Sequence, residues 1–280
     1  SEVTGVAEMK IATYRLDSAV SFNKRYARKS RLDIVSKALE RMGQEVLIKQ
    51  ERNAWAVILK ALAEASTTPY GSSLLKHILK SNTENLFVLD DMNRMLTLIK
   101  RLNESFSGNT PAAPFSSGIT ELYMAPEIME QIRAFAYNAV GNSAVDLPAS
   151  IRESVYHGAG MAEIYGVNLV EMIEFGDGKK YNTLFDSFTS GQSVPGHDSD
   201  AWDDTTAGTT DQILVGLDNT RGSFIRAVAR GTESGGGTFT ALPDDQFAGY
   251  GQRIEKVGFY GHLEEGRVCI DSRAIVGLVV

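Results

Sequence analysis

The segment GHDSDAWDD holds the densest group of side chains able to do chemistry. It places one imidazole and four carboxylates within eight residues: His197, Asp198, Asp200, Asp203 and Asp204. Clustered oxygen ligands suit calcium, but the spacing lacks the glycine and the final glutamate of an EF-hand loop. A transition-metal site would need more histidines. Two interpretations remain: a metal site serving a metal-dependent enzyme, and a solvated acidic loop, which the spacing favours.

The other catalytic signals in the chain are weak. The turn ESGGGT has the glycines of a phosphate-binding loop, but no Lys-Ser or Lys-Thr follows it. The sequence has no GxSxG or HExxH motif, and its single cysteine, Cys269, excludes an internal disulfide and a multi-thiolate metal site. The histidines lie in unrelated settings: His77, His157, His197 and His262. We therefore expect no catalytic residues, no cofactor and no resident metal, and we predict that the chain is not an enzyme.

The composition is that of a globular chain. Its 280 residues are 43% hydrophobic, which is enough for one large or two modest domains. The formal net charge of -7 argues against a protein that coats nucleic acid, because such binding depends on basic charge. No apolar run reaches the roughly 18 residues of a membrane helix, so we expect a cytoplasmic protein without a membrane partner. The first residue, Ser1, fits either removal of an initiator methionine or proteolytic maturation.

Residues 1–31 have the character of an extended arm or loop. They contain seven basic residues, three acidic residues and few apolar ones, so this segment cannot form a core of its own. Its alternating piece IATYRLDSAVSF can form a strand if another part of the chain supplies a second face.

A long helix is predicted to follow. Apolar residues recur three or four positions apart from Leu32 to Val46, and a second stripe continues from Trp55 to Leu62. At about 1.5 Å per residue, one helix over residues 32–66 would span roughly 50 Å. The alternative is two helices that break near Gly43.

Local patterns predict further elements in the middle of the chain. LDDMNRMLTLIKRLNES reads as an amphipathic helix, and ITELYM reads as a strand followed by a helix that begins at Pro126. GVNLV reads as a strand after a turn at Gly166. Residues 176–251 are rich in Gly, Asp, Ser and Thr, which predicts long loops and hairpins with short strands such as QILVGL and SFIRAV. The end of the chain predicts two alternating runs around a turn at LEEG and then a terminal apolar strand.

The order of these pieces resembles the major capsid proteins of tailed bacteriophages. The pieces are the basic segment, the long helix, LYMAPEIMEQIRAFA, YGVNLV and the ending GRVCIDSRAIVGLVV. The resemblance implies an α+β chain with the Hong Kong 97-type capsid fold. Residues 1–31 would be the N-terminal arm and extended loop, and 32–66 the spine helix of the peripheral domain. Residues 67–245 would be the axial domain with a loop-rich insertion, and 246–280 the peripheral domain strands.

The resemblance also implies a function. The chain would assemble as hexamers and pentamers of one protein into an icosahedral shell that encloses packaged double-stranded DNA without sequence-specific binding. Assembly would take place in the host bacterial cytoplasm and the product would be the virion capsid, with portal, scaffold or decoration proteins as possible partners. Encapsulin shells share the fold and are the alternative.

The basic arm is where contacts between subunits are expected. Residues 171–211 hold nine acids and two bases, so the two segments are complementary in charge. Some phages of this family crosslink a loop lysine to an asparagine, but no partner for Lys10 or Lys24 can be placed, so we predict non-covalent contacts. The candidate contact residues are Lys24, Arg25, Arg28 and Lys29.

Overall fold

The computed structural model describes residues 11–23, 32–67, 77–83, 85–107, 118–134, 163–189, 211–228, 242–244 and 256–280. The chain forms two compact units. Unit 1 comprises Ser1–Val57 and Phe224–Val268, and unit 2 comprises Ile58–Ser223 and Cys269–Val280. Both units combine helix and strand, so the predicted α+β class is confirmed.

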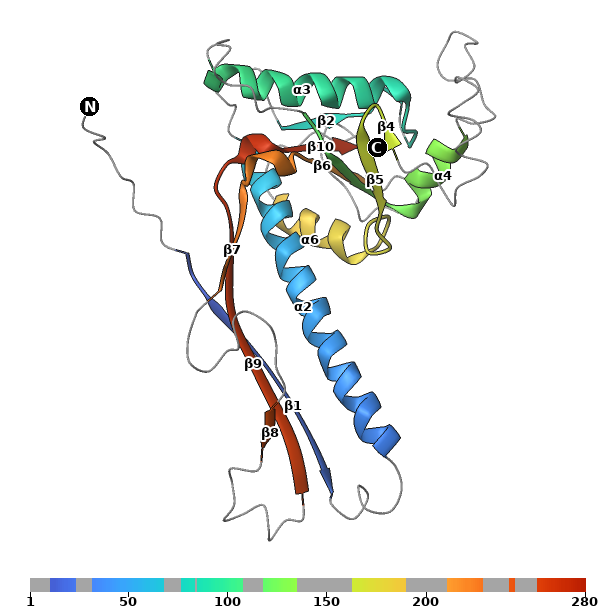
Figure 1. The fold of residues 1–280 in the computed structure, drawn as a ribbon. Helices are drawn as coiled ribbons and strands as arrows, with labels where there is room; N and C mark the ends of the chain where they lie inside the picture. Colours follow the sequence, from blue (N-terminus) through green and yellow to red (C-terminus); the bar gives the residue numbers. More distant parts are fainter. Residues whose placement is uncertain are drawn as a thin grey trace, which may run out of the picture. The chain divides into compact units, whose positions relative to one another are not determined.

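Unit 1 is built on a four-stranded sheet (Figure 1). Its strands are β1 (Tyr14–Asn23), β7 (Phe224–Val228), β8 (Leu242–Asp244) and β9 (Lys256–Cys269). The order is β1-β9-β7, and β8 also pairs with β9. β1 runs antiparallel to β9 over its whole length, from Tyr14 opposite Glu265 to Asn23 opposite Lys256. The second face that the alternating piece of the arm requires is therefore supplied by β9.

The predicted turn at LEEG is wrong. Residues 263–266 lie inside β9, which continues unbroken for 14 residues. Leu263 and Glu265 are both fully buried, so the alternation through LEEG is that of a strand with one covered face. Gly266 allows a close approach of the chain beside β1, because a Cβ there would lie 2.6 Å from the carbonyl oxygen of Ala12.

The long helix is confirmed as one element, α2 (Leu32–Thr67). Within unit 1 it buries Met42, Val46 and Trp55. Gly43 does not interrupt it, because a single glycine costs only about 1 kcal/mol against a run of good helix formers. Its outer surface carries charged pairs one turn apart, such as Arg41 with Glu45 at 3.6 Å.

Unit 2 is built on a six-stranded sheet with the order β2-β10-β6-β3-β5-β4. The strands are β2 (Ile78–Lys80), β10 (Ile275–Val279), β6 (Ile213–Leu217), β3 (Glu121–Met124), β5 (Val167–Glu171) and β4 (Glu163–Ile164). β6 and β10 are buried at every position, which explains why both read as continuous apolar runs. β10 thus belongs to the sheet of unit 2, whereas β9, just before it in the chain, belongs to the sheet of unit 1.

Three helices accompany this sheet: α3 (Leu89–Ser107), α4 (Pro126–Ala134) and α6 (Lys180–Thr189). α3 packs against β10 through a buried stripe that includes Met92, Met95 and Ile99, and α4 begins at Pro126, both as predicted (Figure 1). The prediction of loops and hairpins is wrong where α6 lies. None of the described helices is both long enough and apolar enough to cross a membrane.

Candidate functional site

The structure does not test the residues that the sequence singled out. The four basic contact candidates, Lys24, Arg25, Arg28 and Lys29, lie outside the described residues, as does the whole acidic segment 197–204. Within the described ranges, no three His, Cys, Asp or Glu side chains come close enough together to hold a metal ion. The buried polar groups of the described residues include a carboxylate on β9 in unit 1 and a histidine that lines a pocket in unit 2.

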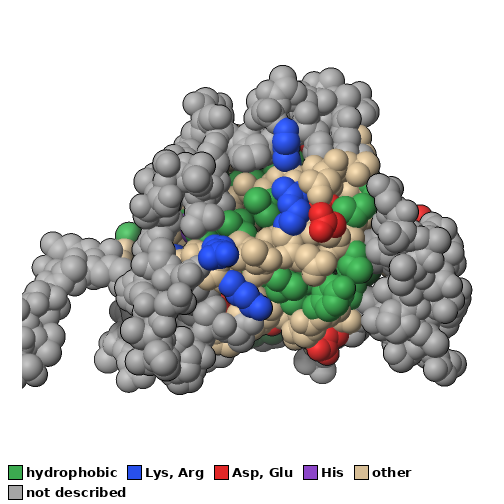
Figure 2. Space-filling model, turned by 90° about the horizontal axis from the view of Figure 1, so that it is seen from above, with side chains coloured by type: hydrophobic (Ala, Val, Ile, Leu, Met, Phe, Trp, Pro, Cys, Tyr) green, Lys and Arg blue, Asp and Glu red, His purple; other side chains and the backbone are tan. Residues whose placement is uncertain are grey.

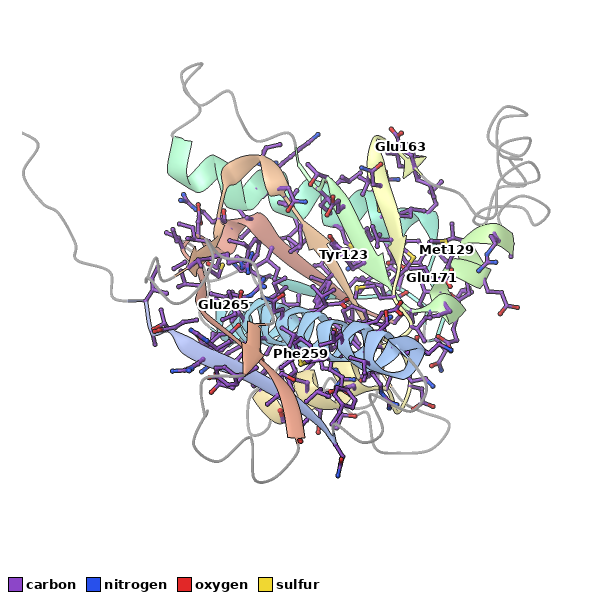
Figure 3. All side chains as sticks on the ribbon, turned by 60° about the horizontal axis from the view of Figure 1, so that its bottom comes forward. Tyr123, Met129, Glu163, Glu171, Phe259 and Glu265 are labelled. Atoms are coloured by element: carbon purple, nitrogen blue, oxygen red, sulfur yellow. The ribbon has the colours of Figure 1, made fainter. Side chains whose placement is uncertain are left out.

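The buried carboxylate of unit 1 is Glu265 on β9 (Figure 3). Tyr14 on β1 donates its hydroxyl to Oε1 at 2.7 Å, and Arg267 donates Nε to the same oxygen at 3.3 Å. Arg226 on β7 donates Nε to Oε2 at 2.7 Å, and Gln50 on α2 donates Nε2 to it at 3.3 Å. One carboxylate therefore joins β1, β7, β9 and α2.

The charge state of Glu265 follows from these contacts. Burial by itself raises the pKa of a carboxyl group, because it disfavours the charged form. Here the hydrogen bonds from Tyr14 and Arg226 and the charges of Arg267 and Arg226 outweigh burial, and the pKa of Glu265 is lowered. The same contacts act on the phenol: burial and the hydrogen bond to Glu265 raise the pKa of Tyr14. At neutral pH the site is an ionised carboxylate held by neutral and cationic donors.

Sequence reasoning missed this site because LEEG has the composition of a turn. A signal was nevertheless present. In the run GHLEEGRVC, Glu265 has the same parity as the apolar Leu263, so a strand would turn a charge towards the covered face. A charge in that position requires partners, and the basic residues Arg226 and Arg267 provide them.

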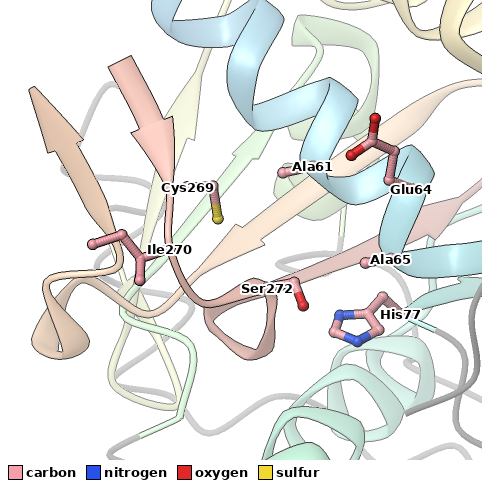
Figure 4. Close-up of a pocket in the computed structure, with 7 residues that line it drawn as sticks. All are labelled: Ala61, Glu64, Ala65, His77, Cys269, Ile270 and Ser272. Atoms are coloured by element: carbon pink, nitrogen blue, oxygen red, sulfur yellow. The ribbon is translucent and has the colours of Figure 1, made fainter. Parts of the chain in front are cut away.

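The pocket of unit 2 is lined by residues that include Glu64 of α2, His77 before β2, Cys269 at the end of β9, and Ser272 between β9 and β10 (Figure 4). The His77 ring is fully buried, and its Nδ1 donates to the carbonyl oxygen of Ile275 at 2.9 Å, which fixes the tautomer. Burial lowers the pKa of His77, and burial raises the pKa of Cys269 to about 11. At neutral pH the imidazole is uncharged and the thiol is protonated. Both side chains therefore act as uncharged packing groups, because a nucleophilic cysteine would need a lowered pKa.

The face of unit 2 that carries α3 shows basic side chains beside hydrophobic ones, with few acidic side chains (Figure 2). Lys100 and Arg101 of α3 are exposed, and Arg94 is partly exposed beside Asp91 at 3.1 Å. Other exposed apolar side chains of unit 2 include Ile173 and Tyr165.

No family model matches the chain, and no curated protein sequence matches it. Solved structures do. The capsid of an empty GTA particle matches 100% of this chain and 79% of its own, with a TM-score of 0.53 and 13% identity. The capsid of cyanophage P-SCSP1u matches 99% of this chain and 78% of its own, with a TM-score of 0.51 and 12% identity. The holo-SrpI encapsulin of Synechococcus elongatus PCC 7942 matches 95% of this chain and 73% of its own at 11% identity, but its TM-score of 0.49 is too low to assign a fold.

Because the identities are only 12–13%, these matches show the fold and nothing further about the chain. The described residues have the α+β fold of phage capsid proteins, which confirms the resemblance inferred from the order of the elements. Fold alone does not define what a protein does, because one fold can serve several functions.

Proposed function

We propose that this chain is the major capsid protein of a tailed bacteriophage, which assembles into an icosahedral shell around packaged double-stranded DNA. The observation that carries the proposal is the likeness to the GTA and cyanophage capsids over 99–100% of the chain. The net charge of -7 is compatible with it, because a shell must enclose DNA without gripping it. The shell would be a homo-oligomer of hexamers and pentamers, assembled in the bacterial cytoplasm, with portal, scaffold or decoration proteins as further partners.

We assign the two units to the domains of this fold. Unit 1, with β1, β9 and the first part of α2, would be the peripheral domain with its extended loop, and unit 2 would be the axial domain. This assignment moves β10 from the peripheral to the axial domain, because β10 pairs with β2 and β6. A separate sheet in each unit supports it.

The titratable groups of the described chain support a structural role. Glu265 is paired with donors from its own subunit, and the raised pKa of Cys269 and the lowered pKa of His77 leave both side chains uncharged at neutral pH. The metal-dependent alternative depends only on segment 197–204, and elemental analysis of the purified protein tests it directly, with stoichiometric metal as the supporting result.

Contacts between subunits are proposed to involve the basic residues that follow β1. They would meet the acidic residues of segment 171–211 on neighbouring copies, because the charges are opposite in sign. Replacing them together with serine should lower particle yield most at low salt. The difference from the wild type should shrink as salt rises, because exposed charge pairs of the wild type are screened over roughly 8 Å at physiological ionic strength. A yield equal to that of the wild type at all salt concentrations would show that these residues do not form the proposed contact. The residues replaced are Lys24, Arg25, Arg28 and Lys29.

A truncation that tests the arm must leave β1 (Tyr14–Asn23) intact. A deletion that reaches residue 28 removes β1, and with it the Tyr14 donor to the buried Glu265, so it would disturb unit 1 itself. A deletion of residues 1–10 leaves β1 whole. It is the variant that separates a role of the arm in assembly from a role in folding.

Size-exclusion chromatography with negative-stain microscopy of the expressed full chain tests the proposed function. The expected result is closed shells of uniform diameter in at least one assembly condition. Monomers or small oligomers in every condition of salt, pH and protein concentration would overturn the proposal. Shells that carry a co-purifying cargo protein in place of a phage genome would instead support the encapsulin alternative.

A further inference from the structure

The strand β1 reaches a fully buried partner at its first residue, Tyr14, whereas Arg15 and Asp17 contact the Tyr260 hydroxyl of β9 at an exposed surface. Every one of its ten residues is described, and none is buried: they alternate between partly buried and exposed along most of the strand. Its side chains therefore contribute little to a core, although its backbone pairs with β9 throughout. At its first residue, however, the Tyr14 hydroxyl reaches the fully buried Glu265.

The arrangement around Glu265 depends on its negative charge. Tyr14 from β1, Arg226 from β7, Arg267 from β9 and the neutral Gln50 from α2 all donate to the carboxylate. A protonated carboxyl group would have to donate its own hydrogen, and neither guanidinium group that faces it can accept one. It would also leave the two guanidinium groups without the opposite charge that holds them together.

The chain beside this site is tightly fitted. Gly266 follows Glu265, and a Cβ at residue 266 would lie 2.6 Å from the carbonyl oxygen of Ala12 and 2.9 Å from Cγ2 of Ile11. The segment that leads into β1 therefore packs directly on the backbone next to the carboxylate. A change at Glu265 should therefore affect this end of β1 before the rest of the strand.

We propose that Glu265 is an acid-sensitive latch for β1. The ionised carboxylate holds Tyr14 against β9, and with it the first paired residues of β1. When the carboxylate takes up a proton from solvent, it loses its charge-assisted hydrogen bonds, and this end of β1 is released. The inference concerns the isolated chain, so its outcome is independent of whether the chain forms shells.

The sign of the pH effect follows from the lowered pKa of Glu265. The latch is closed above the ordinary range of a carboxyl group, about pH 4 to 5, and it opens as the pH falls through the lowered native value. Asp17 on β1 also has a lowered pKa, caused first by the hydrogen bond from Arg15, but this carboxylate is exposed on the other face of the strand, where it also accepts from the Tyr260 hydroxyl of β9. It is therefore the matched control.

Hydrogen exchange of the full chain tests the latch, with amides of β1 compared with those of β6 and β10 as an internal reference. In the wild type, protection factors of β1 should fall between about pH 7 and about pH 3 more than those of the reference strands. Glu265→Gln should show low β1 protection at both pH values, and Asp17→Asn should keep the wild-type pH step. Tyr14→Phe, the milder variant, should lower β1 protection at neutral pH by roughly 10- to 100-fold, which is the worth of a hydrogen bond to a charged group.

Two results would overturn the proposal. One is a Tyr14→Phe variant whose β1 protection stays at the wild-type value while the reference strands are unchanged. The other is a Glu265→Gln variant that keeps the wild-type pH step, because the step would then come from another group. Loss of the step in Asp17→Asn would likewise assign it to the exposed pair.

Discussion

Replacing Gly43 with alanine tests whether α2 is one helix in solution. Gly43 lies in the interior of α2, and a Cβ added there would meet nothing within 4 Å. The substitution therefore adds no clash, and it removes the excess backbone entropy of glycine in the unfolded chain. Alanine is favoured over glycine by about 1 kcal/mol inside a helix. For a chain of this size the gain corresponds to a rise in melting temperature of roughly 2–4 °C.

The assay is thermal unfolding of the soluble full chain followed by circular dichroism. Gly277→Ala is the matched control, because a Cβ at residue 277 would lie 2.9 Å from Cδ2 of Leu62 and 3.2 Å from Cγ1 of Ile78. Both neighbours are buried, so this variant should lose about 1–3 kcal/mol through overpacking. A lower melting temperature in Gly43→Ala would refute the argument, since it would mean that residue 43 needs a backbone conformation that only glycine adopts easily.

Two further predictions concern unit 2. Tyr165 has a φ of 52° in the tight turn between β4 and β5 and is 59% exposed, so Tyr165→Asn should stabilise the chain by up to about 1 kcal/mol in urea unfolding. A destabilised variant would show instead that the tyrosine ring packs on the subunit. Cys269, whose pKa burial raises to about 11, should react with iodoacetamide at neutral pH roughly 100-fold more slowly than an unperturbed thiol. Reaction at the unperturbed rate in the folded chain would contradict the buried setting.

The elements predicted from sequence are those with strong local signals. α2 and α3 have apolar residues spaced three and four apart over many turns, and α4 begins with a proline at its first position. β6 and β10 are short apolar runs because both of their faces are buried. In each case the pattern that the element requires lies within the element's own sequence.

The missed features depend on distant partners. LEEG has the composition of a turn, yet it lies inside a strand. It does so because Glu265 pairs with Tyr14, some 250 positions away in the sequence. α6 was missed because its polar and glycine-rich flanks dominated the composition, although Tyr181 and Phe185 are spaced one helical turn apart and both are buried. The placement of β10 beside β2 and β6 also depends on long-range pairing. The candidate contact residues of the arm remain predictions.

Cryo-electron microscopy of the purified full chain under assembly conditions tests the central claim most directly. The account predicts closed icosahedral particles whose repeating subunit contains the unbroken helix Leu32–Thr67, the six-stranded sheet with β10 beside β6, and β1 paired with β9. Particles of another architecture, or a chain that stays monomeric or forms only small oligomers in every condition, would contradict the assignment as a shell-forming capsid protein.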